Sequence, residues 1–398
     1  MIILAASDKC TGCTACESVC PHSAIDMIKS KEGFFFPKID TNKCVECHLC
    51  EKTCPVLENK AIKNFDKPKA YAYWHNQDRT VSSSGGAFSG FARIILKEGG
   101  YVYGAWMSPE LELKHICISS IEDLPKLRGS KYVQSDLGES FKNIRKQLRD
   151  GHKILFCGTP CEVAGLRAYL KKDYTNLWTL DLVCHGTPSN DVFKNYIDKL
   201  KKRIGRDINA FEFRARKSWG KAPALSGRQL TPVYGVDSLY QEAFDKGAIF
   251  RKSCYTCPFA TIPRQGDCTI ADFWGIGRHG WKFKHSTRQG VSLILANNQH
   301  GQEIVDLLKD CFIEERPLEE ALIENYNISH YSKSYPERDE LIKAFLDPQM
   351  SLDDIDRKFH IVDRSIKAKI KNLASRLGVL DTVKMMITFA LSHKNNKR

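Results

Sequence analysis

Short apolar runs alternate with stretches of helical spacing between residues 70 and 204 of this chain. The runs at 70–75, 101–106, 153–156 and 177–183 are bounded by glycine or polar residues, so they predict buried strands. A loop containing glycine and proline, and then a helical pattern, follows each of the last two runs. Repeated strand–loop–helix units predict parallel strands with crossover helices, and hence an α/β domain with a mostly parallel sheet.

The segment Ser82–Gly86, SSSGG, stands at the start of a predicted helix. Phe88, Phe91 and Ile95 lie on one face of that helix, and the pattern ends at Gly99. Serines can cap a helix, and glycines let a phosphate approach the N–H groups at its positive end. A dinucleotide pyrophosphate would fit, although capped helices with glycines are common for structural reasons alone. No G-x-G-x-x-G fingerprint follows any strand.

The two ends of the chain have a different character. Residues 24–28 and 34–39 predict a short hairpin, and the polar stretch 58–69 predicts a linker. Residues 207–250 indicate strands and loops. After about Pro348 the chain turns polar and then basic, with apolar residues at helical spacing from Ile366 to Leu391. We therefore expect four segments: a small domain at 1–60, a larger domain in two parts at 68–150 and 151–345, and a basic helical tail at 346–398.

The net charge of +13 comes mainly from that tail, since residues 357–398 hold eleven Lys/Arg and two Asp. A basic helix can lie on an acidic membrane surface, dock a partner helix or be a solvated face, so nucleic acid is an unlikely partner. The start, MIILAASDKC, lacks the charged region of a signal peptide, and no apolar stretch reaches 18 residues. Sixteen cysteines without an export signal fit the reducing cytoplasm, so we expect a cytoplasmic protein whose thiols bind metal.

The cysteines give the strongest chemical signal. Two runs, at 10–21 and 44–55, share the spacing Cys-x2-Cys-x2-Cys-x3-Cys-Pro. Thiolate sulfur suits iron–sulfur clusters, and in this pattern the fourth cysteine ligates the other cluster. Zinc sites rarely need eight cysteines in this repeat, and a disulfide framework implies secretion. The first 4Fe–4S cluster is expected to use Cys10, Cys13, Cys16 and Cys54, and the second to use Cys20, Cys44, Cys47 and Cys50.

This segment resembles a bacterial two-cluster ferredoxin module over residues 4–58. The larger domain carries, in order, SSSGGAFSGF, RGSKYVQSD, FCGTPCEVAGLR, DLVCHGTPS, and CYTCPF followed by DFWG. Together these motifs resemble the coenzyme F-420 hydrogenase/dehydrogenase beta-subunit family over residues 70–345. The resemblance implies FAD and a 4Fe–4S cluster in this domain. The expected fold is therefore an α+β ferredoxin-like iron–sulfur module, an α/β domain with a mostly parallel sheet, and a helical basic tail.

The resemblance also implies residues that contact FAD. Lys131 could place a positive charge near the flavin, or be a surface lysine. His185 could donate a proton, or make a structural hydrogen bond, and Trp274 is expected in the core. The expected FAD contacts are Ser83, Ser84, Gly85, Gly86, Ser130, Lys131, Tyr132 and Gln134.

A third 4Fe–4S cluster is expected in the larger domain, because two cysteines end adjacent predicted strands and a Cys-x2-Cys pair supplies two more. The expected ligands are Cys161, Cys184, Cys254 and Cys257, with Cys157 and Cys268 as rivals. The pair together with Cys268 could instead belong to a zinc site.

We expect an oxidoreductase that passes electrons between a redox partner, the clusters, FAD and an organic substrate or deazaflavin-like cofactor. The alternative is a non-catalytic electron-transfer subunit of a larger redox complex. An iron–sulfur protein that binds nucleic acid is a weaker third possibility, suggested by the charge alone.

Overall fold

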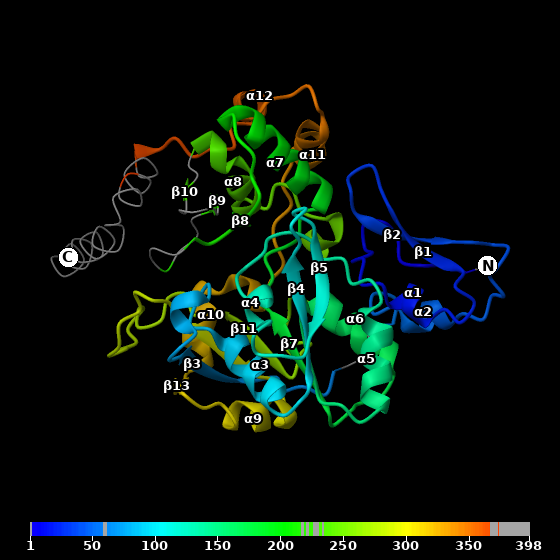
Figure 1. Ribbon diagram of the computed structural model, residues 1–398, viewed down its shortest axis with the longest axis vertical. Helices are drawn as coiled ribbons and strands as arrows, with labels where there is room; N and C mark the ends of the chain where they lie inside the picture. Colours follow the sequence, from blue (N-terminus) through cyan, green and yellow to red (C-terminus); the bar gives the residue numbers. More distant parts are fainter. Residues whose placement is uncertain are drawn as a thin grey trace.

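Figure 1 shows the computed structural model of the chain, which describes residues 2–58, 62–215, 219, 223–225, 231–232, 235–366 and 373. The N-terminal segment forms a small module, drawn in blue, that lies beside α5 and α6 of the larger body. It contains β1 (Ile25–Lys29) paired antiparallel with β2 (Phe35–Ile39), and the single-turn helices α1 (Ala15–Val19) and α2 (Leu49–Thr53). The expected hairpin is confirmed.

The larger body is built on an eight-stranded sheet in the order β13-β3-β12-β11-β7-β6-β4-β5. Four central strands, β4, β6, β7 and β11, are parallel, as the strand–loop–helix units predicted. The outer pairings of β5, β12, β3 and β13 are antiparallel, so the sheet is mixed with a parallel centre. The strands are β3 (Lys69–His75), β4 (Tyr101–Met107), β5 (Leu113–Ile118), β6 (Ile154–Gly158), β7 (Leu177–Leu182), β11 (Cys268–Asp272), β12 (Ser292–Ala296) and β13 (Cys311–Arg316).

Helices cover both faces of this sheet. In β6, Leu155 packs into one apolar cluster with α3 (Ala87–Lys97) and α9 (Gln299–Asp306). Its neighbour Phe156 packs into another cluster with α5 (Ser140–Arg149) and α6 (Pro160–Leu170). Successive side chains of a strand point to opposite faces, so these two residues identify the two helical layers. Both layers bury apolar side chains that the sequence places at helical spacing.

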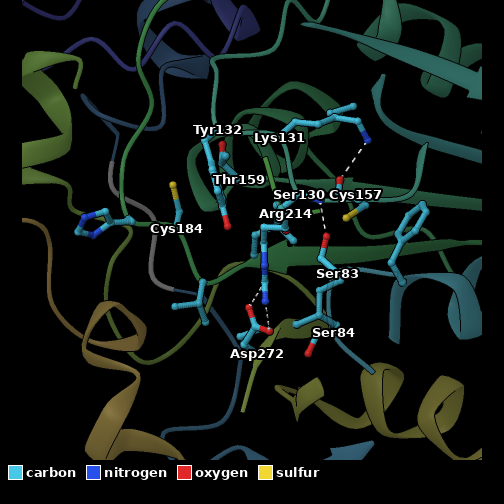
Figure 2. Close-up of a pocket in the computed structure, with 18 of the residues that line it drawn as sticks. Ser83, Ser84, Ser130, Lys131, Tyr132, Cys157, Thr159, Cys184, Arg214 and Asp272 are labelled. Carbon is cyan, nitrogen blue, oxygen red and sulfur yellow. Dashed lines mark hydrogen bonds and ion pairs between the residues drawn. The ribbon is translucent and has the colours of Figure 1, made fainter. Parts of the chain in front are cut away.

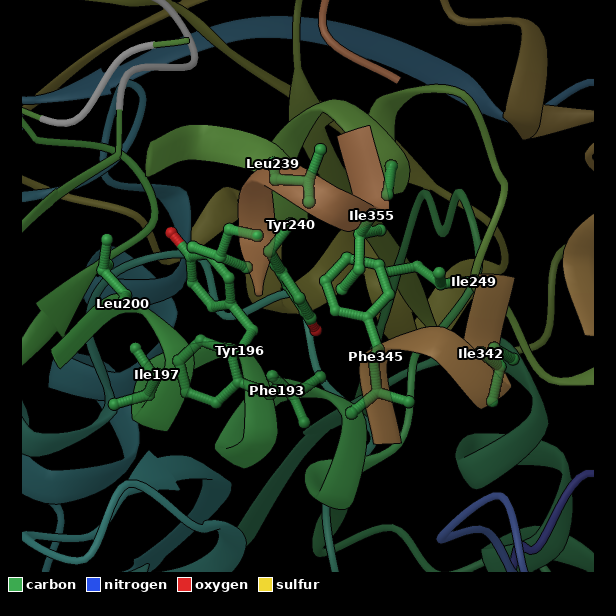
Figure 3. Packing of buried hydrophobic residues seen from close by; sticks show 14 of the residues in the cluster. Phe193, Tyr196, Ile197, Leu200, Leu239, Tyr240, Ile249, Ile342, Phe345 and Ile355 are labelled. Atoms are coloured by element: carbon green, nitrogen blue, oxygen red, sulfur yellow. The ribbon is translucent and has the colours of Figure 1, made fainter. Parts of the chain in front are cut away.

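A third apolar core lies outside the sheet, around Tyr196 of α7 (Asn190–Ile204) and Tyr240 of α8 (Leu239–Asp245) (Figure 3). Their rings stack with centroids 5.3 Å apart. The expectation of strands and loops throughout 207–250 is wrong at α8, because Leu239, Tyr240, Ala243 and Phe244 place apolar side chains at helical spacing. The strands expected there are the two-residue β8 (Phe211–Glu212), β9 (Ala224–Leu225) and β10 (Thr231–Pro232).

The same core extends past the expected boundary at residue 345. Leu352, Ile355 and Phe359 of α12 (Leu352–Phe359) are buried in it beside α11 (Arg338–Leu346), so this part of the expected tail belongs to the body. Most of the expected amphipathic helix lies outside the described residues. No helix within the described ranges combines the length and apolar character that a membrane crossing requires. The remaining helices are α4 (Leu124–Leu127), α10 (Leu318–Glu324) and the 3-10 turns Arg79–Val81, Gly235–Ser238, Lys252–Thr256 and Tyr326–Ile328.

Candidate functional site

Two small cavities in the N-terminal module gather the eight cysteines into two groups of four. Each group combines three cysteines of one run with the last cysteine of the other. This is the interleaved arrangement that the spacing predicts for two cubanes. The first cavity is lined by Cys10, Cys13, Cys16 and Cys54, and the second by Cys20, Cys44, Cys47 and Cys50.

The two runs fold in the same way. Each single-turn helix follows a residue in the left-handed region, Thr14 (φ 59°) or His48 (φ 57°), and each ends at an extended cysteine, Cys20 or Cys54. The repeated turn therefore sends each fourth thiol across to the other group. Burial raises the pKa of the Cys13 thiol to about 12, so bare thiolates are disfavoured here. A bound metal cluster compensates for that penalty.

A third group of four thiols lies in the larger body. Cys161 lies in the first turn of α6, Cys184 follows β7, Cys254 lies within the 3-10 turn Lys252–Thr256, and Cys257 directly follows that turn. All four line one cavity. Burial raises the pKa of all four, to about 11 for Cys257. The hydroxyl of Thr159, the residue before α6, lies 3.2 Å from the sulfur of Cys161.

The rival cysteines are elsewhere. Cys157 lines a separate, larger cavity, and the sulfur of Cys268 donates to the carbonyl of Gly301 at 3.3 Å. The structure therefore brings together Cys161, Cys184, Cys254 and Cys257, without Cys157 or Cys268. Among the described residues, no three His, Cys, Asp or Glu side chains stand at the spacing of a single metal ion. A four-iron cubane is wider than one ion, so its thiolates stand further apart.

The larger cavity has a volume of about 500 Å³ and opens where β6, β7 and β11 end. Figure 2 shows side chains from several of these loops directed toward it. In open α/β sheets the ligand crevice lies outside the carboxyl ends of the strands. The position and size of this cavity are those expected of a ligand or cofactor site.

The serine–glycine loop forms one wall of this cavity. The Ser83 hydroxyl accepts a hydrogen bond from the backbone N–H of Ser130 at 2.8 Å, and Ser84 donates to the carbonyl of Val291 at 2.9 Å. Gly86 caps α3 with φ 88° and lines the cavity. Gly85 does not line it; a β-carbon there would lie 2.1 Å from the carbonyl oxygen of Tyr73. The absence of a side chain at Gly85 therefore allows the loop to pack closely against the sheet.

Three of the four residues expected from the second motif also line the cavity: Ser130, Lys131 and Tyr132. The ammonium of Lys131 donates to the carbonyls of Leu127, Arg128 and Gly129. Burial lowers the pKa of Lys131 to about 7.

Gln134 is the exception. Its side-chain amide donates to the carbonyl of Thr11 at 3.1 Å, at the contact between the N-terminal module and the body. Gln134 is not among the residues that line the cavity, so the structure does not bring it together with the other three expected contacts.

Several lining residues were missed by sequence reasoning. Arg214 forms a buried ion pair with Asp272 at 2.5 Å (Figure 2). The indole N–H of Trp219 donates to the same carboxylate at 2.6 Å. Trp274 lines the cavity and stacks on Trp219 with centroids 4.8 Å apart, so it is not simply a core residue. Asp272 and Trp274 lie in the DFWG motif, which was the available signal. Arg214 had no comparable signal.

Asp78 is a second missed residue. It is buried, accepts hydrogen bonds from Arg93 and Arg128, and holds the Ser82 hydroxyl through its own carbonyl at 2.7 Å. These two guanidinium groups help to hold the pKa of the Asp78 carboxyl below its usual range despite burial. Asp78 thus anchors both the serine–glycine loop and Arg128, which lines the cavity.

The cavities form a connected series. Thr11 lines both the first cysteine cavity of the N-terminal module and the third cysteine cavity. Cys184, His185, Gly186 and Thr187 line both the third cysteine cavity and the larger cavity. The His185 ring lies within hydrogen-bond distance of Asn327 and of the carbonyl of Asp245, which suits a structural role.

This chain is similar to a curated protein and to a chain in a solved structure. One is a curated protein, a subunit of the F(420)H(2) dehydrogenase of Methanosarcina mazei, 24% identical over 232 residues. The alignment covers 53% of this chain and 64% of that protein, so less than two thirds of the relative is matched. A chain in a xenon-derivatized F420-reducing [NiFe] hydrogenase complex from Methanosarcina barkeri is 15% identical, with a TM-score of 0.42. That similarity covers 75% of this chain and 94% of the other.

Two family models match separate parts of the chain. Residues 9–57 match a 4Fe-4S dicluster domain. Residues 151–321 match the C-terminal region of the beta subunit of coenzyme F420 hydrogenase/dehydrogenase. The resemblance expected from the motifs is therefore confirmed: one part of this chain matches a 4Fe-4S dicluster domain, and another part matches the C-terminal region of the coenzyme F420 hydrogenase/dehydrogenase beta subunit.

Proposed function

We propose that this chain is an iron–sulfur flavoprotein oxidoreductase that passes electrons through three 4Fe–4S clusters and FAD. One end of this path meets a redox partner, and the other meets an organic substrate or a deazaflavin-like cofactor. One observation carries the proposal: consecutive cavities share lining residues, Thr11 at one junction and Cys184–Thr187 at the next. A series of adjoining redox sites is what electron transfer across a protein requires.

The third cysteine cavity fits a cubane. Its four thiols have raised pKa values, which a metal cluster would reverse, since a coordinating thiol is deprotonated. Cys161 lies in the first turn of α6, where the helix dipole favours negative charge. Arg251 and Arg264 line the same cavity and add positive charge. The proposed ligands are Cys161, Cys184, Cys254 and Cys257.

The larger cavity fits a dinucleotide with an anionic linkage. The first turn of α3 presents N–H groups beside Gly86, where a pyrophosphate can approach the backbone. Among the described residues, Arg128 and Arg214 each have a carboxylate partner, whereas Lys131 has only carbonyl acceptors. Lys131 is therefore the cation of this cavity that an anionic ligand would complement.

Bound FAD would supply the conversion between one-electron transfer at clusters and two-electron chemistry on an organic molecule. The chain's own residues would hold and orient it. Ser83, Ser84 and Gly86 would position its phosphate side, with Ser130, Lys131 and Tyr132 on the facing loop. Trp274, which lines the same cavity and stacks on Trp219, offers an aromatic surface for a planar ring.

The alternative is a subunit that only carries electrons within a larger redox complex, with substrate chemistry on another chain. The name of the curated relative favours it, because that protein is one subunit of a dehydrogenase. A cytoplasmic location suits either role, since clusters and free thiols persist in a reducing compartment.

Anaerobic purification followed by iron and flavin counts tests the proposal. We expect about twelve irons per chain, about four for each of three cubanes, and one non-covalent FAD. About eight irons, or no flavin after reconstitution, would contradict it. Turnover of a deazaflavin or dye by the isolated chain then separates the enzyme from the electron-carrying subunit.

A further inference from the structure

Arg251 is a buried cation at the contact between the N-terminal module and the body. Its side chain is 1% exposed. It donates from Nε to the carbonyl of Cys10 at 2.6 Å, and from its two other nitrogens to the carbonyl of Phe35 at 2.9 Å and the side-chain oxygen of Gln134 at 3.3 Å. The guanidinium also lies 4.1 Å from the centre of the Phe36 ring. All of these acceptors are neutral, and no carboxylate pairs with Arg251 among the described residues.

Arg264, which lines the same cavity, is a buried cation whose charge is balanced by a carboxylate. It is also fully buried, but it is paired with Asp181 at 3.0 Å. Burying a charge without a partner is costly, and proteins normally pair or neutralise such groups. Arg251 therefore lacks the compensation that Arg264 has from its own chain.

The proposed clusters on both sides of Arg251 would supply the negative charge that balances its guanidinium. Its side chain donates to the backbone carbonyl of Cys10, a proposed ligand of the first cluster, while its own carbonyl accepts from the backbone N–H of Cys254 at 3.0 Å. Cys254 is a proposed ligand of the third cluster, and Arg251 lines that cavity. A cubane with four thiolate ligands carries net negative charge, and that charge increases by one when the cluster accepts an electron.

We propose that Arg251 is a positioning residue for electron transfer: its positive charge raises the reduction potentials of the first and third clusters, and its hydrogen bonds join the two sites. This proposal rests on the proposed function for the third cluster. Each cluster gains one electron on reduction and no bond breaks, while the guanidinium keeps its protons. Its charge favours the reduced form of both neighbours because opposite charges attract more strongly in a poorly solvated site. Among the described residues, Arg251 has no hydrogen bond to the four cysteines of the second group, whereas it donates to the carbonyl of Cys10 of the first group.

Reductive titration of the full-length, cluster-loaded protein, followed by electron paramagnetic resonance, tests this proposal. Arg251→Gln should shift the reduction equilibrium of the first and third clusters about tenfold toward the oxidised form. For a one-electron couple this is about 59 mV more negative. The second cluster should not shift, and the iron content should stay at the wild-type level. Unchanged potentials at full iron content would overturn the proposal.

Two further variants separate charge from mechanical support. Arg251→Lys keeps the charge and should retain most of both potentials; a shift as large as that of Arg251→Gln would overturn the role of charge. Glu32→Gln removes the carboxylate that pairs with Arg338 at 2.6 Å across the same contact, and leaves Arg251 intact. Because this change removes a negative charge, it should lower neither potential. A shift in this control equal to that of Arg251→Gln would assign the effect to loosening of the contact.

A variant that keeps Arg251 covers the case in which Arg251→Gln does not fold. Gln134→Glu places a carboxylate beside the guanidinium and should lower the same two potentials by partly neutralising it. Unchanged potentials there would also count against the proposal. A separate measurement tests the proposed function: an iron count of about eight in the wild-type chain, four per cubane, would mean that the third cluster is absent. In that case the first-cluster potential alone decides the role of Arg251.

Discussion

Gly165 of α6 lies directly against Cys13 of the dicluster domain. A β-carbon at Gly165 would stand 2.9 Å from the β-carbon of Cys13 and 3.0 Å from its sulfur. From the other side, a β-carbon at Gly12 would stand 2.8 Å from the side chain of Gln134. Glycine thus allows close contact from both surfaces. The dicluster domain is therefore packed on the body at backbone level, which keeps its first cysteine group next to the third.

Gly165→Ala tests the importance of this contact. The added methyl group would crowd Cys13, and overpacking of this kind typically costs about 1–3 kcal/mol, partly offset by about 1 kcal/mol of better helix propensity. We expect a lower free energy of unfolding and an altered first-cluster resonance signal. Denaturant titration and electron paramagnetic resonance measure the two effects. A variant with wild-type stability and signal would show that the contact has room for a side chain.

The third cluster can be tested by its ligands. Cys161→Ala, Cys184→Ala and Cys257→Ala should each lower the iron content by about four per chain, because a cubane that loses a ligand is usually lost. The signals of the dicluster domain should remain. Iron counting with electron paramagnetic resonance of the reduced variants provides the measurement.

Cys157→Ala and Cys268→Ala are the matched controls for these ligand variants. Their sulfurs lie in the larger cavity wall and beside Gly301, away from the group of four. Both should keep the wild-type iron content. Loss of iron in either control, with retention in the ligand variants, would move the cluster to a different set of thiols.

The sequence predicted the parts of this protein whose pattern is local. The repeated cysteine spacing predicted both groups of four thiols, because the same turn is encoded twice within a short segment. The parallel centre followed from strand–loop–helix units. The antiparallel outer strands did not, since β3 pairs with β12 and β13, more than 200 residues away along the chain. Apolar strands that are buried on both faces carry no pattern that identifies their neighbours.

Site residues were likewise predictable where their sequence pattern is local. The loop at Ser83–Gly86 was recognised because a helix start has a sequence signature, whereas the contact of Gln134 with Thr11 depends on how the dicluster domain packs on the body. Asp78 and Arg214 were missed, since each acts through a partner distant in sequence, Arg128 and Asp272 respectively. Long-range polar pairs leave no periodic signal in one sequence.

The proposed phosphate position is tested by Gly86→Asp, which puts a carboxylate at the start of α3 beside the proposed pyrophosphate. Repulsion between like charges should remove most of the bound flavin. Gly86→Ala is the control, since it strains the same left-handed backbone position without adding charge. We expect the alanine variant to keep more flavin than the aspartate variant at equal protein recovery. Equal occupancy in both variants and the wild type would place the phosphates elsewhere.

The last prediction concerns the pH dependence of flavin binding through Lys131. Burial holds its pKa at about 7, well below the ordinary value for lysine. An anionic ligand nearby would stabilise the ammonium and raise that pKa, so binding above pH 7 must take up a proton. Flavin affinity should therefore be nearly constant below pH 7 and weaken as the pH rises above it.

Lys131→Met provides the comparison, because it keeps the length of the side chain and removes the charge. Its flavin affinity should be lower than that of the wild type at pH 6.5, roughly tenfold for the loss of one partly buried charge contact. The two affinities should converge toward pH 9, where the wild-type lysine of the free protein is neutral, with the variant showing little pH dependence. The measurement is flavin titration of deflavinated protein by fluorescence quenching, with proton uptake followed in weakly buffered solution. A wild-type affinity that stays flat from pH 6.5 to pH 9 would mean that Lys131 does not face the anionic part of the ligand.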